Sequence, residues 1–167
     1  MMGSPARLSQ TMPRGGVDRV GDAALSRLIG YNLKRTFNGI HVDLSDVLRP
    51  LGLRMITFTI LTMLKENPGV RLSNLALAID MEKPNIVSLI DELAAQQLVT
   101  RSADPDDRRA RQLHLTAAGT ELQRQAYGRV CEHEAAFLRD LSDSERQQLV
   151  SILAKIRRSA GQRAFTA

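Results

Sequence analysis

Apolar residues recur at steps of three and four positions through most of the chain, which is the spacing of amphipathic helices. The pattern predicts helices over about Asp22–Val47, Leu53–Lys65, Leu72–Ile79, Pro84–Ala94 and Ala117–Arg139, and a last helix from Ser142. Two further stretches, Leu98–Arg101 and Arg111–Leu115, alternate apolar and polar residues as half-buried strands do. We therefore expect a mainly α-helical protein with a small β-hairpin, and Val70–Arg71 is a candidate third strand.

Two short helices in the middle of the chain form a helix-turn-helix pattern. Ser73 is a candidate cap for the first helix, and Asp80–Lys83 interrupts the apolar spacing. Pro84 suits the first turn of the second helix, because its missing N–H has no helical partner there. The second helix of such a pair enters the DNA major groove with its N-terminal residues facing the bases, and Asn85 can bond adenine through two atoms. A plain helical hairpin with a solvated polar face is the alternative interpretation.

A charged segment, Ser102–Ala110, separates the two predicted strands, and its Asp and Pro residues predict a hairpin with an extended tip. A helix-turn-helix followed by a β-hairpin is a winged helix. Arg108 and Arg109 lie near the predicted tip, where a guanidinium can enter a minor groove or contact a phosphate. Asp107 projects to the same side as Arg109 on a strand-like tip, so its carboxylate can hold that guanidinium. A solvated charged turn is the alternative.

The helix pair and the hairpin together supply a candidate DNA-binding set of polar and charged residues. Its members are Ser73, Asn74, Lys83, Pro84, Asn85, Ser88, Arg101, Asp107, Arg108 and Arg109. The formal net charge of +5 and the sequence pI of about 10.0 fit a polyanionic partner.

Composition and motif content narrow the class of protein. The 167 residues are 43% hydrophobic and 25% charged, which is ordinary for a soluble protein. No apolar run approaches the roughly 18 residues of a membrane span, and no signal-peptide core is present, so we expect a cytoplasmic protein without a membrane partner. Cys131 and His133 lie two apart on a predicted helix and point to nearly opposite sides. With no phosphate-binding loop or HExxH motif, we expect no enzymatic activity, no metal and no cofactor.

The ends of the chain suggest an assembly. Residues 1–20 are rich in glycine and proline and are expected to form a flexible arm. The first and last helices carry apolar stripes with little chain left to cover them, so we expect them to form a dimer interface. The predicted organisation is a dimerisation helix over 21–50, a winged helix-turn-helix over 51–115, and C-terminal helices of the dimerisation region over 116–167. A monomer that folds its terminal helices back on itself is the alternative.

The motif DPDDRRARQLHLTAAG, Asp104–Gly119, resembles the wing and following helix start of the MarR family of bacterial transcription regulators. Leu72–Ala76 and Asp91–Leu93 are similar to the two helices that precede the wing in that family. The resemblance implies a homodimer that places two recognition helices in successive major grooves of a palindromic double-stranded DNA site. It also implies that Arg109 enters the minor groove with support from Asp107. We expect a repressor, and activation is the alternative.

The same resemblance implies control by a small ligand or by thiol oxidation. The implied ligand pocket lies between the dimerisation helices and the winged domain, and its candidate lining residues are Tyr31, Phe37, His41, Arg54, Met55 and Phe58. The stretch Pro50–Phe58 is similar to members that sense aromatic acids or their CoA thioesters, with Arg54 as a candidate for the CoA phosphates.

Two alternatives to ligand control of DNA binding remain. Cys131 is the candidate for a thiol-oxidation sensor, but oxidant-sensing members usually carry the cysteine near the first helix, so we interpret it as structural. A winged-helix module that uses the same surface against a protein is the other functional alternative.

Overall fold

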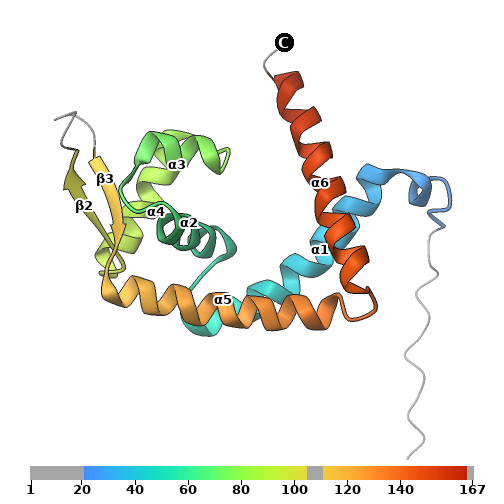
Figure 1. The fold of residues 1–167 in the computed structure, drawn as a ribbon, viewed down its shortest axis with the longest axis horizontal. Helices are drawn as coiled ribbons and strands as arrows, with labels where there is room; N and C mark the ends of the chain where they lie inside the picture. The colour runs from blue at the N-terminus through green and yellow to red at the C-terminus, as the bar shows by residue number, and fades with distance from the viewer. Residues whose placement is uncertain (1–20, 105–110, 165–167) are drawn as a thin grey trace, which may run out of the picture. The chain divides into compact units, whose positions relative to one another are not determined.

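The computed structural model describes residues 21–104 and 111–164. Figure 1 shows a mainly helical chain with a small sheet, as predicted. Two compact units, Met1–Thr36 and Phe37–Ala167, divide the chain within its first long helix, α1 (Ile29–Leu48). After α1, the second unit contains a 3-10 turn (Arg49–Leu51), α2 (Met55–Glu66), β1 (Val70–Arg71), α3 (Leu72–Ala78), α4 (Lys83–Ala95), β2 (Val99–Ala103), β3 (Arg111–Leu115), α5 (Ala117–Phe137) and α6 (Asp143–Ala164).

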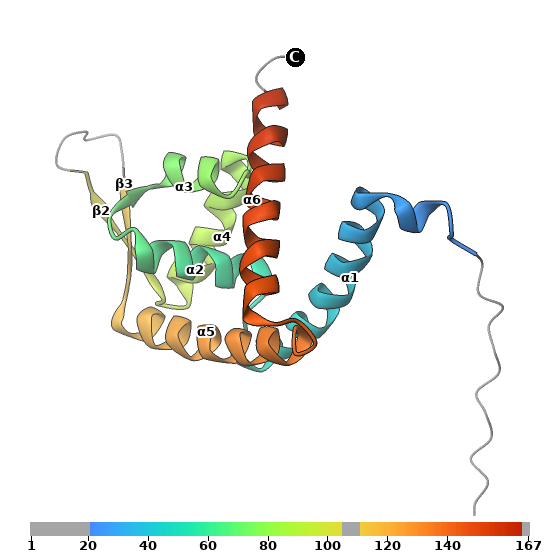
Figure 2. The same cartoon turned by 45° about the vertical axis from the view of Figure 1, so that its right-hand side comes forward.

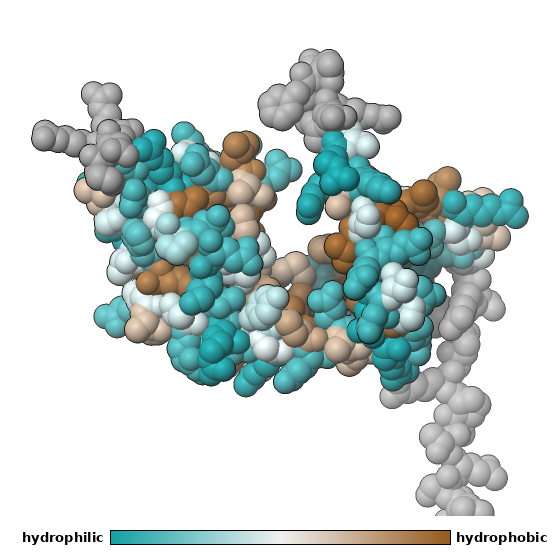
Figure 3. Space-filling view, in the orientation of Figure 1, coloured by the Kyte–Doolittle hydropathy of each residue, from teal (hydrophilic) through white to brown (hydrophobic). Residues whose placement is uncertain are grey.

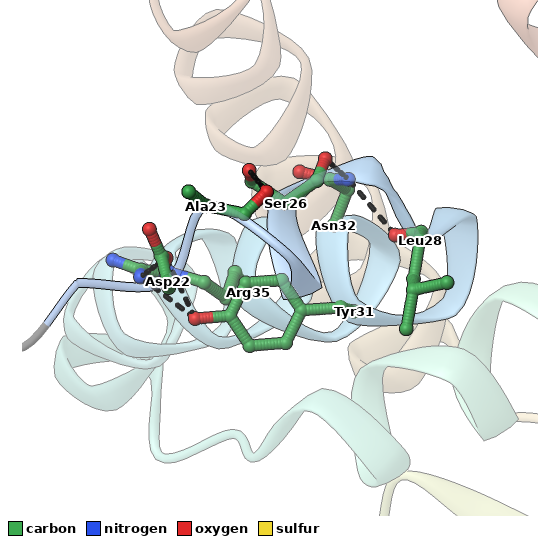
Figure 4. Close-up of polar contacts among 7 residues, drawn as sticks. All are labelled: Asp22, Ala23, Ser26, Leu28, Tyr31, Asn32 and Arg35. Atoms are coloured by element: carbon green, nitrogen blue, oxygen red, sulfur yellow. Dashed lines mark hydrogen bonds and ion pairs between the residues drawn. The ribbon is translucent and has the colours of Figure 1, made fainter.

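The first unit contains a 3-10 turn, Leu25–Arg27, and the start of α1. The sequence predicted one continuous helix from Asp22. In the structure the helix is interrupted at Leu28, whose ψ of 125° is extended. The side-chain amide of Asn32 holds this break, because it donates to the carbonyl oxygens of Ser26 (2.7 Å) and Leu28 (2.9 Å; Figure 4). The helical prediction is therefore correct for α1 and wrong for the residues before it.

The hydrophobic core of the second unit lies where α2, α3 and α4 meet the sheet, and Figures 1 and 2 show these helices gathered beside the hairpin. Ile60 of α2, Leu75 of α3, Ile86 and Ile90 of α4 and Leu113 of β3 are almost completely buried. The helical residues belong to the stripes that the three- and four-residue spacing predicted, and Leu113 is the buried position of the predicted alternating strand. The central position of α2 as support for the helix-turn-helix is thus a direct consequence of its apolar sequence.

The sheet is antiparallel with strand order β1-β3-β2. β2 pairs with β3 along its full length, from Val99 opposite Leu115 to Ala103 opposite Arg111. β1 is short and pairs Val70 with Leu113. The predicted hairpin and third strand are both confirmed.

The last two helices begin at the predicted caps. Thr116 caps α5, because its hydroxyl oxygen accepts a 2.9 Å hydrogen bond from the N–H of Gly119. Ser142 and Glu145 form the predicted capping box, with the Glu145 carboxylate accepting from the Ser142 N–H at 2.8 Å and the Glu145 N–H donating to the Ser142 hydroxyl at 3.3 Å. The hydrogen bond from the Ser142 hydroxyl lowers the pKa of Glu145.

Both helices of the helix-turn-helix end in a left-handed residue that is not glycine. Asp80 follows α3 with φ 53°, and Gln97 follows α4 with φ 57°. The Leu98 N–H bonds the Leu93 carbonyl at 2.9 Å, and the Gln97 N–H bonds the Ala94 carbonyl at 2.9 Å. This is the Schellman arrangement, in which glycine is the usual left-handed residue. These ends turn the chain sharply enough to place α4 against the hairpin.

The first and last helices expose much of their apolar surface. On α1, Ile29 and Phe37 are 69% and 54% exposed, and on α6 Val150 is 67% exposed. Apolar side chains also reach the surface in Figure 3. The exposed stripes agree with the expectation that the folded chain leaves them uncovered.

In the described part of the chain no single helix is long and apolar enough to cross a membrane. The segment Ile29–Leu51 and α2 reach the required length and composition only as a bent pair, and α2 is a buried core helix.

Candidate nucleic-acid interface and adjoining cavity

The first two turns of α4 present polar side chains to solvent. Lys83, Pro84, Asn85 and Ser88 are all exposed, as expected for residues that contact a partner. Pro84 lies in the first turn, and its carbonyl accepts a 3.2 Å hydrogen bond from the Ser88 hydroxyl. The opposite face of α4 is fixed in the core, so this polar surface stands on a rigid support. The binding role of these residues stays a prediction.

Ser73 and Asn74 lie exposed on the first turn of α3, close in the sequence to the end of β1. The prediction that Ser73 caps α3 is wrong. The helix begins at Leu72, Arg71 occupies the capping position, and its side chain makes no capping hydrogen bond. Because β1 runs directly into α3, the serine falls inside the helix, two positions after the capping position.

Arg101, a predicted DNA contact, lies on β2 and pairs with Asp91 of α4. This ion pair ties the wing strand to the helix beside it. Asp107, Arg108 and Arg109 lie outside the described residues. The geometry of the wing tip therefore stays a prediction, and the hairpin that carries it is described up to Asp104 and again from Arg111.

Asp104 anchors the base of the wing and departs from the sequence interpretation. The sequence placed it in the extended tip of the hairpin, with a solvated charged turn as the alternative, but its side chain is only 2% exposed. It accepts a 2.7 Å hydrogen bond from the Arg71 guanidinium on β1 and a longer one, at 3.4 Å, from the Gln112 amide on β3. This carboxylate directly follows β2 and thus links that edge strand to the central strand β3 and the opposite edge strand β1. Arg71 and Asp104 are 33 positions apart, so the sequence pattern did not show their pairing.

The wing and α5 join through a very close backbone approach. The Leu98 carbonyl accepts hydrogen bonds from the Thr116 N–H at 3.0 Å and from the Thr116 hydroxyl at 3.3 Å. Gly119 lies against the same carbonyl, and a Cβ added to Gly119 would lie 2.0 Å from the Leu98 oxygen. The LTAAG end of the wing motif therefore has a structural reason for its glycine.

A cavity of about 730 Å³ opens between α1, α2 and α3 within the second unit. Its lining residues are Phe37, His41, Ser45, Arg49, Leu53, Arg54, Met55, Ile56, Thr59, Met63, Ala78 and Ile79. The volume is within the range of small-molecule sites, roughly 300–1,000 Å³. The rings of Phe37 and His41 lie 5.4 Å apart on one wall. Arg49 and Arg54 bring two cations to the edge of an otherwise mostly apolar space.

Four of the six residues proposed for a ligand pocket line this cavity, namely Phe37, His41, Arg54 and Met55. Phe58 instead packs against the hydrophobic core. Tyr31 belongs to the first unit, where its hydroxyl donates to the Asp22 carboxylate at 2.8 Å (Figure 4). Whether the cavity binds a ligand stays a prediction.

The lining residues recur at a regular spacing in the sequence, which the sequence analysis did not use. Phe37, His41, Ser45 and Arg49 are spaced four apart in and just after α1, and Met55, Thr59 and Met63 repeat the same step in α2. Residues four apart lie on one face of a helix. Extending the row from the two predicted members on α1 would have found Ser45 and Arg49.

Arg54 connects the cavity to α4. It precedes the first residue of α2, and its guanidinium forms an ion pair with Glu92 on α4. The backbone N–H of Arg54 donates to the Thr57 hydroxyl at 2.9 Å, which fixes the start of α2. The second cation, Arg49, pairs with Asp46 of α1 at 2.5 Å.

Hydrogen bonds shift the pKa of two exposed carboxylates outside this region. Those from Arg124 and then Gln125 lower the pKa of Glu121 to about 2, and Glu121 in turn raises the pKa of Arg124. In the first unit, the Tyr31 hydroxyl and then the charge of Arg35 lower the pKa of Asp22. The same contacts raise the pKa of Arg35, the Tyr31 hydrogen bond first. These ion pairs lie on the protein surface and involve neither α4 nor the cavity.

Cys131 lies exposed on α5, and its interpretation as a structural residue stays a prediction. Within the described ranges, no three His, Cys, Asp or Glu side chains gather in a way that could hold a metal ion.

Comparison with known proteins gives a consistent result. A sequence model described as the MarR family matches residues 53–110. A protein of Thauera aromatica, assigned as a transcriptional regulatory protein for the hcr operon, is 32% identical over 101 residues. That match covers 60% of this chain, and the chain spans 61% of the length of that relative.

Solved structures match over more of the chain. The transcriptional repressor CouR bound to a 23-mer DNA duplex is 31% identical, with a TM-score of 0.79 over 84% of this chain and 99% of that one. CouR from Rhodococcus jostii RHA1 bound to p-coumaroyl-CoA is 27% identical, with a TM-score of 0.72 over 79% of this chain and 93% of that one.

Proposed function

Because the chain belongs to the MarR family of winged-helix transcription regulators, we propose that it is a homodimer that binds a palindromic site on double-stranded DNA. We further propose that a small molecule in the cavity controls this binding. The observation that carries the DNA-binding half is the exposed polar surface on the first two turns of α4, supported by a core-fixed face. A repressor-DNA complex of similar fold, CouR on its duplex, supports the same assignment.

The residues on α4 suit base readout in a major groove. Asn85 can bond adenine through two atoms, and Lys83 can reach a base or a phosphate. Val87 lies exposed beside them, and its methyl groups suit contact with a thymine methyl. Ser73 and Asn74 on α3, and Arg101 on β2, extend the surface toward the DNA backbone. Arg109 takes the minor groove in this proposal, as the family resemblance implies.

A second copy of the chain is the partner we propose for the uncovered helices. The apolar stripes of α1 and α6 have no covering segment among the described residues, and monomeric proteins rarely expose contiguous apolar patches of this kind. A dimer places two copies of α4 roughly 34 Å apart, one turn of the double helix, so that two half-sites contribute to the affinity.

The cavity suits an amphiphilic anion. Its walls are mostly apolar, with an aromatic ring pair on one side and two arginines at the edge. An aromatic acid or its CoA thioester has this chemistry, and CouR binds p-coumaroyl-CoA. Ligand binding that weakens DNA affinity is the mode of a repressor, and we propose that mode for this cytoplasmic regulator.

The test is a binding-site selection from randomised duplexes with the full-length protein, followed by fluorescence anisotropy on the selected site and light scattering for the mass in solution. We expect a dimer and a preferred palindromic site. Asn85→Ala should relax the preference at one base pair by about 1–3 kcal/mol, whereas Arg109→Ala should weaken binding to all sequences.

The protein-interaction alternative makes the opposite prediction. It gives weak DNA affinity that moderate salt abolishes, with no enriched sequence. A monomer with no sequence preference would contradict the proposed function. A Cys131→Ser protein that loses oxidant-dependent DNA release would instead support the thiol-sensor alternative.

A further inference from the structure

Two consecutive carboxylates tie α4 to the elements on either side of it. Asp91 pairs with Arg101 of the wing strand β2, and Glu92 pairs with Arg54 at the start of α2. The two ties differ in what lies beyond them. Arg101 leads to the wing, whereas Arg54 also lines the cavity. The Arg54–Glu92 contact is therefore a direct link between the cavity and the helix that we propose reads DNA.

The two arginines at the cavity edge differ in the position of their ion-pair partners. Arg54 pairs with a carboxylate on α4, 38 residues away in the sequence. Arg49 pairs with Asp46, only three residues earlier in α1. Both arginines can attract an anion that enters the cavity. Only Arg54 has to leave a partner on α4 to do so.

We propose that Glu92 is an internal competitor for the cavity, and that the anionic group of the effector displaces it from Arg54. This inference rests on the proposed function and adds the means by which the cavity controls α4. The described residues that line the cavity include no Asp or Glu, so a ligand carboxylate or phosphate meets no repulsion from the wall. The Arg54 and Glu92 side chains are 59% and 40% exposed, so exchanging one anion for another at this guanidinium requires no buried charge to appear.

The displacement has two effects on α4, and both weaken DNA binding. The helix loses its tie to α2 while keeping its tie to the wing through Asp91. The released Glu92 carboxylate also places an unpaired negative charge on the helix that faces the phosphates, where like charges repel. The magnitude is that of an exposed ion pair, which corresponds to about a two- to fivefold change in affinity.

Three single variants separate the role of each residue. Glu92→Gln removes the competitor, Arg54→Gln removes the shared cation, and Arg49→Gln is the matched control that removes a cavity cation with no partner on α4. The probes are p-coumaric acid, its CoA thioester, and the uncharged amide of p-coumaric acid. The acid and the thioester distinguish a carboxylate from CoA phosphates, and the amide keeps the apolar body without the anion. Calorimetry measures probe affinity, and anisotropy measures release of the selected duplex at probe saturation.

We expect Glu92→Gln to bind the anionic probes about two- to fivefold more tightly than the unmodified protein, with no change for the amide. Arg54→Gln and Arg49→Gln should both bind the anions more weakly. At saturation, the extra release that the anions cause over the amide should disappear in Glu92→Gln and Arg54→Gln and persist in Arg49→Gln. A purely structural role for Glu92 would weaken binding of all probes together, so the gain in affinity is the diagnostic result.

Equal anion affinity in Glu92→Gln and the unmodified protein overturns the inference, as does unchanged anion-specific release. So does failure of every probe to bind. In each of these cases sequence-specific DNA binding by the unmodified protein leaves the DNA-binding part of the proposed function standing. Failure to select any duplex contradicts the proposed function itself, and probe affinities then decide the competition between Glu92 and the ligand separately.

Discussion

Replacing Gly119 with alanine tests the packing between α5 and the wing. The added Cβ would lie 2.0 Å from the Leu98 carbonyl oxygen and 2.9 Å from its carbon, and both neighbours are backbone atoms. A side chain cannot move aside to relieve this contact, so the first turn of α5 must shift away from β2. That shift strains or breaks the two hydrogen bonds from Thr116 to the Leu98 carbonyl.

The expected loss follows from these contacts. Overpacking of a tight site costs about 1–3 kcal/mol. The two strained hydrogen bonds contribute about 0.5–1.5 kcal/mol each. Alanine recovers about 1 kcal/mol through its higher helix propensity. Together they predict that Gly119→Ala lowers the free energy of unfolding by about 1–5 kcal/mol.

Urea unfolding monitored by circular dichroism measures this loss, and α5 provides a matched control. Gly128 lies in the same helix, and an added Cβ there meets nothing within 4 Å. Gly128→Ala should therefore be neutral or stabilise the protein by up to about 1 kcal/mol. Equal stability of the two alanine variants would refute the close-approach argument.

Three further predictions concern single contacts. Gln97→Gly should stabilise the protein by about 1 kcal/mol, measured by urea unfolding, because glycine adopts the left-handed conformation without steric cost. Asp104→Asn should destabilise it by about 1–3 kcal/mol in the same assay, because the buried carboxylate that pairs with Arg71 is lost. The Glu121 carboxyl should titrate by NMR near pH 2 instead of 4.5, and Arg124→Gln should return it toward 4.5. Since folding lowers this pKa, the contribution of Glu121 to stability is complete above pH 4.5 and decreases as the pH falls toward 2.

Local sequence signals predicted the elements of this fold well, because each depends on residues close together in the chain. The caps at Thr116 and Ser142, the proline at the start of α4 and the alternation of the hairpin all act within a few residues. The errors at helix starts have local physical causes too. Asn32 bonds the carbonyls that a longer α1 would have used, and Arg71 takes the capping position expected for Ser73.

The ion pairs of the candidate site could not be predicted from the spacing of residues in the sequence. The ion pairs of Arg54 with Glu92 and of Arg71 with Asp104 join residues 38 and 33 positions apart. Such partners are chosen by tertiary packing, and the sequence shows each of them only as one charged residue among many. The left-handed turn at Gln97 was also missed, because the glycine that normally marks such a helix end is absent.

The hairpin is closed by the full-length pairing of β2 with β3 and, at its base, by the hydrogen bond from the Thr116 N–H to the Leu98 carbonyl. Enlarging a closed loop adds little entropy cost, roughly 0.6 kcal/mol for each doubling of its length. The tip can therefore be lengthened, shortened or exchanged for that of another protein without disturbing the helices on either side. Evolution can therefore alter one end of this hairpin while the helical scaffold keeps its packing.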